Sequence, residues 1–294
     1  MVWVEGEPGI GKSSLVAEAL ATVSQLGWDV GWGMADTLTE RLPLRVMLDC
    51  LQVRLYSSDP HRAQAASLLR TRREGLFGDG DESVNGIEVL VTLADELCAA
   101  APTVMVVEDL QWADDASLFV WHQLAASIDQ LRLLLIGTCR SPLRRPGVQE
   151  VRAAVARRGG AVITLGPLTE ADVAAMVTAM VGAPPGDRLR RLTAQAAGNP
   201  LYVRELVDAL VREQALHVGR AAELSVADRQ MPVSLTAVLG DRLSSVSADT
   251  AQMLRTAALL GGRFAVTDLA VVLRRPVSDL AVGLQEAVTA DIAE

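Results

Sequence analysis

The first residues that could carry chemistry lie near the start of the chain, in the segment GEPGIGKSS (6–14). This segment matches the pattern G-x-x-x-x-G-K-[ST] and lies between an apolar run and a helical pattern, which is the context of a phosphate-binding loop. Its glycines allow successive backbone N–H groups to turn inward and form an anion site at a helix N-terminus. We expect the Lys12 ammonium to reach the β- and γ-phosphates of a nucleotide and the Ser13 hydroxyl to ligate Mg²⁺. The residues expected to surround the nucleotide are Gly6, Glu7, Pro8, Gly9, Ile10, Gly11, Lys12, Ser13 and Ser14.

Lys12 is the only lysine of the chain, and every other one of its 27 basic residues is arginine. At a surface position either residue is a solvated positive charge. Between two phosphates, in a ring of backbone amides, a compact ammonium fits where a planar guanidinium does not. The isolation of Lys12 therefore supports the assignment of a nucleotide site.

A pair of acids follows a second apolar run, in VMVVEDLQWADD (104–115). A carboxylate that helps to hold Mg²⁺ is the expected partner of such a loop, and Glu108 and Asp109 come at the carboxyl end of a strand, where open α/β sheets bind ligands. We expect one acid to hold Mg²⁺ and the other to polarise the attacking water. Such pairs commonly read Asp then Glu, so the reversed order leaves the two roles open. The alternative is a solvated acidic turn. Asp114 and Asp115 are expected to cap the next helix.

The segment LLLIGTCRS (133–141) places Thr138 and Arg140 at the end of another strand. Arginine matches phosphate oxygens with two parallel hydrogen bonds, so Arg140 is a candidate sensor of the γ-phosphate. The alternative is a surface arginine at the start of a loop.

The first half of the chain alternates short, continuously apolar runs with helical patterns, which predicts a parallel sheet covered on both faces. After Gly166 and Pro167 only helical patterns remain, and Thr169 with Asp172 indicates a capping box. We divide the chain into a nucleotide-binding core (1–167), a helical lid (168–231) and a last helical domain (232–294). The expected strands are 2–5, 28–36, 103–109, 132–139 and 161–165; the expected helices are 11–26, 44–56, 60–74, 85–100, 115–128, 148–157, 169–182, 186–197, 201–214, 234–244, 248–259 and 278–289, with an exposed loop at 78–86.

Composition excludes several other classes. The chain has 294 residues, half of them apolar, and a net charge of −9, which argues against a general nucleic-acid-binding surface. No apolar segment is long enough to span a membrane, so we expect a cytoplasmic protein without membrane contact. The cysteines and histidines show no paired spacing typical of disulfide or zinc sites; they are Cys50, Cys98, Cys139, His61, His122 and His217.

Four segments together resemble a known family: VEGEPGIGKSSLV, VVEDLQWADDASL, LLLIGTCRS and AGNPLYVRELVDALVREQAL. They are similar to the ATPase module of the STAND class, in particular that of the large LuxR-type (MalT-like) bacterial transcriptional regulators, and the likeness continues through 235–264. The resemblance implies an α/β P-loop NTPase core of the AAA+ type with parallel sheet order 5-1-4-3-2. It further implies an all-α lid, a partial winged-helix-type domain, and ATP or ADP with Mg²⁺ held between core and lid.

In this family a G-x-P motif of the lid contacts the nucleotide base, and the motif maps onto Gly198, Asn199 and Pro200. A helix N-cap at Asn199 followed by Pro200 at the first helical position is an alternative that is compatible with that role.

Two departures from the family lead us to expect truncation at both ends. The segment that usually precedes the first strand and helps to bind adenine is lacking, and the chain ends near where a wing hairpin would begin. The sensor repeats and the DNA-binding domain expected downstream are also missing, so we expect a fragment of a larger regulator or a shortened relative.

The resemblance implies a nucleotide-dependent switch that is closed with ADP, opens and self-associates with ATP, and resets by slow hydrolysis. A stand-alone P-loop ATPase or kinase with catalytic turnover is the alternative. Direct DNA binding by this chain is not expected, because the reader domain is missing and the charge is negative.

Overall fold

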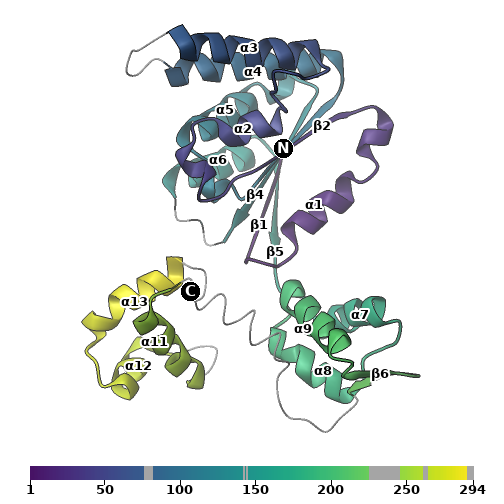
Figure 1. The fold of residues 1–294 in the computed structure, drawn as a ribbon, viewed down its shortest axis with the longest axis vertical. Helices are drawn as coiled ribbons and strands as arrows, with labels where there is room; N and C mark the ends of the chain where they lie inside the picture. The colour runs from purple at the N-terminus through teal and green to yellow at the C-terminus, as the bar shows by residue number, and fades with distance from the viewer. Residues whose placement is uncertain (76–81, 142, 144, 225–245, 261–263, 290–294) are drawn as a thin grey trace. The chain divides into compact units, whose positions relative to one another are not determined.

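The computed structural model describes residues 1–75, 82–141, 143, 145–224, 246–260 and 264–289 (Figure 1). The chain divides into two compact units, Met1–Gly166 and Pro167–Glu294, and each is described by itself.

The first unit is built on a five-stranded sheet. Its strands are β1 (Val2–Gly6), β2 (Asp29–Met34), β3 (Thr103–Glu108), β4 (Leu133–Arg140) and β5 (Ala161–Leu165). They run parallel in the order β2-β3-β4-β1-β5, which confirms the predicted order 5-1-4-3-2. Because all strands are parallel, their carboxyl ends meet at one edge, and that edge carries the polar residues singled out in the sequence.

Helices cover the two faces of this sheet unequally. The connection from β1 to β2 runs one way across the sheet and all later connections run the other way, so right-handed crossovers put them on opposite faces. One face carries α1 (Lys12–Leu20), and the other carries most of the remaining helices of the unit (Figure 1). Those later helices are α2 (Arg45–Cys50), α3 (Pro60–Gly75), α4 (Glu82–Ala100), α5 (Asp115–Ala126) and α6 (Pro146–Arg157).

Two helices are much shorter than predicted, and the helix expected over 186–197 also ends early, at Thr193. The helix expected over 11–26 ends at Leu20 and continues as a 3-10 turn, Val23–Leu26. The helix expected over 44–56 ends at Cys50, where Gln52 adopts a left-handed conformation with φ 53°. Backbone turns of this kind leave little trace in apolar spacing, which is why the pattern overextended both helices.

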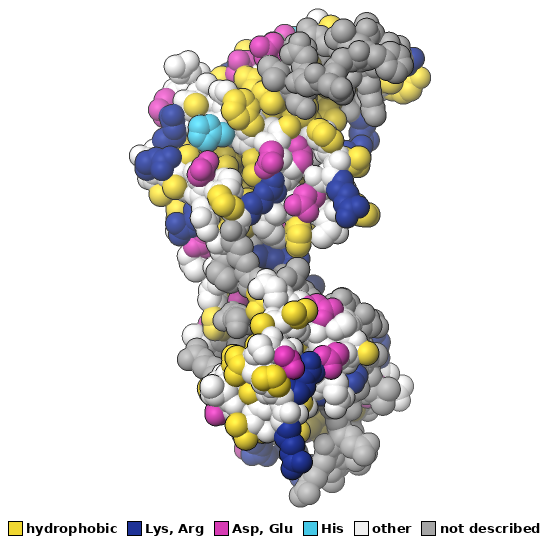
Figure 2. Space-filling model, turned by 90° about the vertical axis from the view of Figure 1, so that its left-hand side faces the viewer, with side chains coloured by type: hydrophobic (Ala, Val, Ile, Leu, Met, Phe, Trp, Pro, Cys, Tyr) yellow, Lys and Arg dark blue, Asp and Glu magenta, His cyan; other side chains and the backbone are white. Residues whose placement is uncertain are grey.

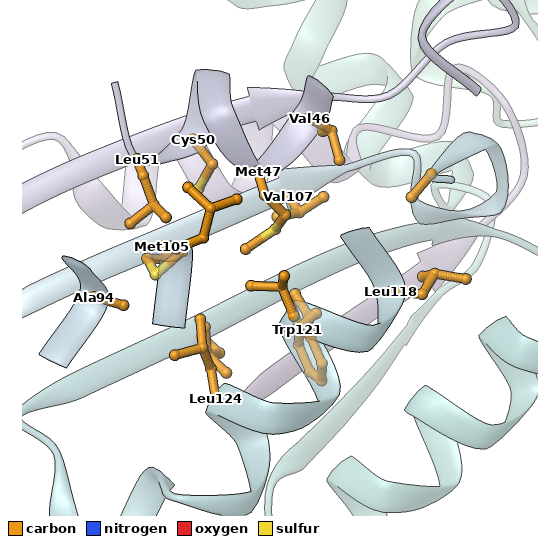
Figure 3. Packing of buried hydrophobic residues seen from close by; sticks show 14 of the residues in the cluster. Val46, Met47, Cys50, Leu51, Ala94, Met105, Val107, Leu118, Trp121 and Leu124 are labelled. Atoms are coloured by element: carbon orange, nitrogen blue, oxygen red, sulfur yellow. The ribbon is translucent and has the colours of Figure 1, made fainter. Parts of the chain in front are cut away.

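β3 is buried along its whole length, and its residues alternate between two cores. Val104 and Val106 belong to the core beneath α1, whereas Met105 and Val107 pack with side chains of α2 and α5 on the other face (Figure 3). This alternation places the next residue, Glu108, on the α1 side of the sheet.

α2 packs unusually close to β2. A Cβ atom added to Gly31 would lie 2.1 Å from the Cys50 carbonyl oxygen, and one added to Gly33 would lie 2.4 Å from that of Val46. Because each added Cβ would collide with a backbone carbonyl, only glycine fits at these two positions.

A buried carboxylate ties β1 to its neighbours. Glu5 is 6% exposed and accepts hydrogen bonds from Trp3 Nε1 (2.9 Å), Arg152 Nε (2.6 Å) and Nη2 (2.9 Å), and Thr164 Oγ1 (3.1 Å). The hydrogen bond from the Arg152 guanidinium is the main reason why the pKa of Glu5 is lowered, against the opposing effect of burial. The network fixes β5 and α6 against the strand that leads into the phosphate loop.

The second unit begins with α7 (Glu170–Val181), α8 (Asp187–Thr193) and α9 (Pro200–Arg212). The predicted capping box of Thr169 and Asp172 is present. A two-stranded antiparallel sheet, β6 (Leu216–Val218) with β7 (Ala222–Leu224), corrects the prediction of a purely helical second half. Strands of three residues are too short to show an alternating pattern.

The last described segments are α11 (Ala248–Leu259), α12 (Val266–Leu273) and α13 (Val277–Thr289). α12 was not predicted, because its three valines weaken the helical propensity on which the interpretation relied. Glu286 of α13 accepts hydrogen bonds from Ser247 N (2.6 Å), Ser247 Oγ (2.7 Å) and Thr250, which fixes the start of α11. The helix predicted at 234–244 and residues 78–81 of the loop predicted at 78–86 lie outside the described residues. Residues 82–86 form the start of α4, so the loop prediction was wrong there.

None of the helices in the described ranges is long and apolar enough to cross a membrane. On the face drawn in Figure 2, acidic and basic side chains are interspersed over the described surface.

The sheet unit has two fully buried tryptophans, Trp3 and Trp121, whose substitutions can be compared directly. Trp3 donates to Glu5, whereas Trp121 Nε1 has no hydrogen-bond partner among the described residues. Each change to phenylalanine removes a similar volume, but only Trp3→Phe deprives a buried charge of a donor. We expect Trp3→Phe to destabilise the unit by about 1.5–3 kcal/mol more than Trp121→Phe, because hydrogen bonds to charged groups contribute about that much. Urea unfolding of the full chain, followed by circular dichroism, measures the difference. Equal losses would contradict a stabilising role for the Trp3–Glu5 bond.

Candidate nucleotide-binding site

The loop between β1 and α1 has the local geometry of an anion site. Gly6 approaches β5 so closely that an added Cβ would lie 2.7 Å from the Leu165 carbonyl oxygen. Gly11 precedes the first residue of α1 with φ 104°, a conformation that favours glycine, and no side chain of that residue caps the helix. The first N–H groups of a helix have no partner within it, so this end of α1 is suited to an anion.

The side chain of Lys12 lies over the loop. It is 7% exposed, and its Nζ donates to the carbonyl oxygens of Gly6 and Glu7, at 3.0 Å each. These bonds place a buried positive charge at the loop itself, so the cation that a phosphate would meet is already in position.

Glu108 lies beside the start of α1. Its carboxylate is almost fully buried, at 4% exposure, and accepts from two side chains of different elements. Ser13 Oγ, in the first turn of α1, donates to Oε2, and Trp32 Nε1 of β2 donates to Oε1 at 2.7 Å. The structure thus brings together Ser13 and Glu108, two of the predicted Mg²⁺ ligands.

Asp109 has different partners from Glu108. Its backbone is left-handed, with φ 54°, and its N–H donates to Thr138 Oγ1 at 3.1 Å. Its Oδ1 accepts from Gln111 Nε2 at 2.9 Å and lies 3.7 Å from Arg140 Nε, on β4. Asp109 and Arg140, predicted separately, are therefore partners, and the two adjacent acids face different neighbours.

Gln111 is a site residue that the sequence interpretation missed. Besides donating to Asp109, it accepts from the Arg140 backbone N–H at 3.1 Å, so one amide joins the ends of β3 and β4. A polar residue two positions after the acid pair was the available signal, but its partner comes from a strand 29 residues further along the chain.

Ser13 and Glu108 fit a Mg²⁺ site by their chemistry. No group of three or more metal-binding His, Cys, Asp or Glu side chains occurs among the described residues. Mg²⁺ does not need one, since it takes hard oxygen ligands and commonly keeps waters and phosphate oxygens around one or two protein groups. A hydroxyl next to a buried carboxylate is such a pair. Asp109, also predicted as a ligand, has its described contacts with Gln111, Thr138 and Arg140 instead.

Asp114 and Asn199 cap helices as predicted, whereas Asp115 is the first residue of α5 and its side chain accepts from Arg145 instead. Asp114 accepts from Ser117 N at 2.9 Å at the start of α5, and also from Leu44 N at 3.0 Å. In the second unit, Asn199 Oδ1 accepts from Leu201 N at 3.1 Å, and Pro200 is the first residue of α9. The helix-cap interpretation of Asn199 and Pro200 is confirmed, and contact with a nucleotide base stays a prediction.

The sheet order and the loop between β1 and α1 give the first unit the fold of a P-loop NTPase core. Residues 1–136 match the family profile of the AAA ATPase domain. No curated protein sequence shows a match to the chain.

Solved structures of similar fold have low sequence identity. The ORC1 protein of Aeropyrum pernix, solved in complex with DNA, has a TM-score of 0.53 at 16% identity, over 98% of this chain and 77% of that one. A signal transduction ATPase with numerous domains (STAND) with a tetratricopeptide repeat sensor, from Pyrococcus horikoshii, has a TM-score of 0.45 at 13% identity. The match covers 97% of this chain and 36% of that one. AMPPCP-bound DnaA from Aquifex aeolicus has a TM-score of 0.47 at 9% identity, and the match covers 98% of this chain and 81% of that one. At 16% identity the likeness to the ORC1 protein concerns the fold alone.

Proposed function

We propose that this chain is the ATP-binding and slowly hydrolysing switch module of a signal-responsive transcriptional regulator of the STAND type. The observation that carries the nucleotide site is the buried carboxylate of Glu108, paired with Ser13 at the start of α1 beside the Lys12 loop. The regulatory role rests on the sequence resemblance.

Nucleotide binding would use the loop as it lies. The phosphates are met by backbone N–H groups at the start of α1 and by the Lys12 ammonium. Lys12 gives up its hydrogen bonds to the Gly6 and Glu7 carbonyls and donates to phosphate oxygens, which are charged and therefore stronger acceptors.

Ser13 and Glu108 would hold Mg²⁺, and Asp109 would act on water. When bound, Mg²⁺ would offset the negative charge of the phosphates. Asp109 is held at the adjacent strand end by Gln111 and Arg140, where it can orient a water and accept its proton. Arg140, whose Nε lies 3.7 Å from Asp109 Oδ1, would sense the γ-phosphate by donating to its oxygens instead, while Gln111 continues to hold the Asp109 carboxylate.

In the proposed switch, the bound nucleotide would control how the core and the second unit are arranged. A γ-phosphate with its Mg²⁺ is a large charge that can bias the equilibrium between two arrangements of domains. We infer a closed form with ADP and an open, self-associating form with ATP, with hydrolysis returning the second to the first. The signal-sensing and DNA-binding domains would be supplied by other segments of such a regulator.

Lys12→Ala tests the nucleotide site. We expect ATP affinity to fall at least about 30-fold, since truncating one partner of a hydrogen-bonded charge pair costs about 2–5 kcal/mol. Lys12→Arg keeps the charge and should also bind poorly, because the guanidinium does not fit the loop. Calorimetric titration measures both, with thermal unfolding as the control for folding. Wild-type affinity in Lys12→Ala would refute the site.

Asp109→Asn and Glu108→Gln separate the two acids. Asp109→Asn should retain Mg²⁺-dependent ATP binding while hydrolysis falls about 10²–10⁴-fold, the range typical of a lost general base. Glu108→Gln should instead weaken the dependence of binding on Mg²⁺. Phosphate release at saturating ATP and binding titrations with and without Mg²⁺ provide the two measurements. If Glu108→Gln alone stops hydrolysis with Mg²⁺-dependent binding intact, the roles are reversed.

The switch predicts a resting state with retained nucleotide. Denaturing the purified chain should release ADP, and steady-state hydrolysis should stay below about 1 s⁻¹, under the range of ordinary enzymes. Chromatography of the released nucleotide and a phosphate assay test this. Faster turnover, or phosphate appearing on an added small molecule, would favour the stand-alone ATPase or the kinase.

A further inference from the structure

We propose that Trp32 of β2 is a positioning residue for the Mg²⁺ site, acting through Glu108. The inference rests on the proposed nucleotide-binding function and adds to it a residue with no metal-binding chemistry of its own. An indole N–H donates hydrogen bonds and cannot accept them or ligate a cation, so its only polar partner can be an acceptor such as Glu108.

The sheet register brings the two side chains together. Trp32 pairs with Val106, two residues before Glu108, so both side chains emerge on the same face of the sheet. The indole Nε1 then donates to Glu108 Oε1 at 2.7 Å. A bond of this length to a carboxylate is short for an N–H donor, which is typical of a charge-assisted hydrogen bond.

The ring that carries this donor is itself fixed. Trp32 is half-buried and packs against the small core beneath α1, which contains Val104, Val106 and Val16. Packing on an apolar surface restricts the ring to one orientation, and so aims the N–H at one oxygen of the carboxylate.

Each oxygen of the Glu108 carboxylate therefore accepts a hydrogen bond from a different element. Trp32 occupies Oε1, and Ser13 donates to Oε2. With Oε1 held by the indole, rotation of the carboxyl group is restricted, and Oε2 stays directed at the Ser13 hydroxyl, the other group that would hold Mg²⁺. Hydrogen-bond partners of this kind orient metal-binding groups, and their loss typically costs about 10–100-fold in metal affinity.

Trp32→Phe distinguishes this role from packing, because phenylalanine keeps an aromatic ring and loses the N–H. ADP affinity is measured by calorimetric titration of the full chain, once in EDTA and once across a range of Mg²⁺ concentrations. We expect affinity in EDTA to match that of the wild type, and the Mg²⁺ concentration needed for half of the enhancement to rise about 10–100-fold.

Trp28→Phe is the matched control. Trp28 directly precedes β2 and is 36% exposed, and the indole that Glu108 accepts from belongs to Trp32. The control should keep the wild-type Mg²⁺ dependence. A Trp32→Phe protein with wild-type Mg²⁺ dependence would overturn the proposal.

A double-mutant cycle tests whether Trp32 acts through Glu108. If it does, Trp32→Phe should add nothing to the Mg²⁺ defect of Glu108→Gln, because the two residues share one interaction. Independent, additive defects would overturn the proposal.

Should Trp32→Phe fail to fold, the indole N–H resonance of Trp32 in the wild-type protein provides the test. It should shift when Mg²⁺ is added to the ADP complex, and an unchanged resonance would count against the role. A wild-type chain that binds no nucleotide would overturn the proposed function and this inference together. A wild-type chain with Mg²⁺-enhanced binding that Trp32→Phe shares would overturn this inference alone.

Discussion

A carboxylate buried at the end of a central strand is the constraint around which the nucleotide site is organised. Glu108 is 4% exposed, and a buried charge is stable only where hydrogen bonds replace the lost water. Its two donors come from α1 and β2, which are remote in sequence from β3. Satisfying this one charge therefore fixes the start of the helix that follows the phosphate loop against the middle of the sheet.

The topology of the sheet explains why such different segments can meet. Right-handed connections place α1 on the face opposite to α2 and α5, and the first turn of α1 lies beside the end of β3, where Ser13 donates to Glu108. The opposite face is occupied by the larger core, and there Glu5 and Arg152 secure the strand that leads into the loop. An ion pair on the face of the larger core thus holds the strand from which the phosphate loop begins.

Local sequence was sufficient for part of this arrangement and insufficient for the rest. The loop, the acid pair and the capping residues Asp114 and Asn199 are encoded within a few neighbouring residues, so their types and spacing revealed them. The sheet order was accessible through the family resemblance. The contacts of Trp32 and Gln111 depend on strand register and on segments tens of residues apart, which apolar spacing does not encode. The hairpin of β6 and β7 and the helix α12 were missed because their local patterns are weak.

The order of the two acids acquires a geometric meaning from these contacts. Glu108 stands at the last position of the strand and must reach both a serine on the helix and an indole on the neighbouring strand, which its extra methylene allows. Asp109 follows in a left-handed turn, a conformation that aspartate tolerates better than most residues, and needs only a short side chain to meet Gln111. Exchanging Glu108 and Asp109 would conserve charge and composition. It would shorten the side chain at position 108 and place glutamate, a less suitable residue, in the left-handed turn at position 109. The order of the two acids therefore matters, because position 108 needs a long side chain and position 109 needs a residue that tolerates a left-handed backbone.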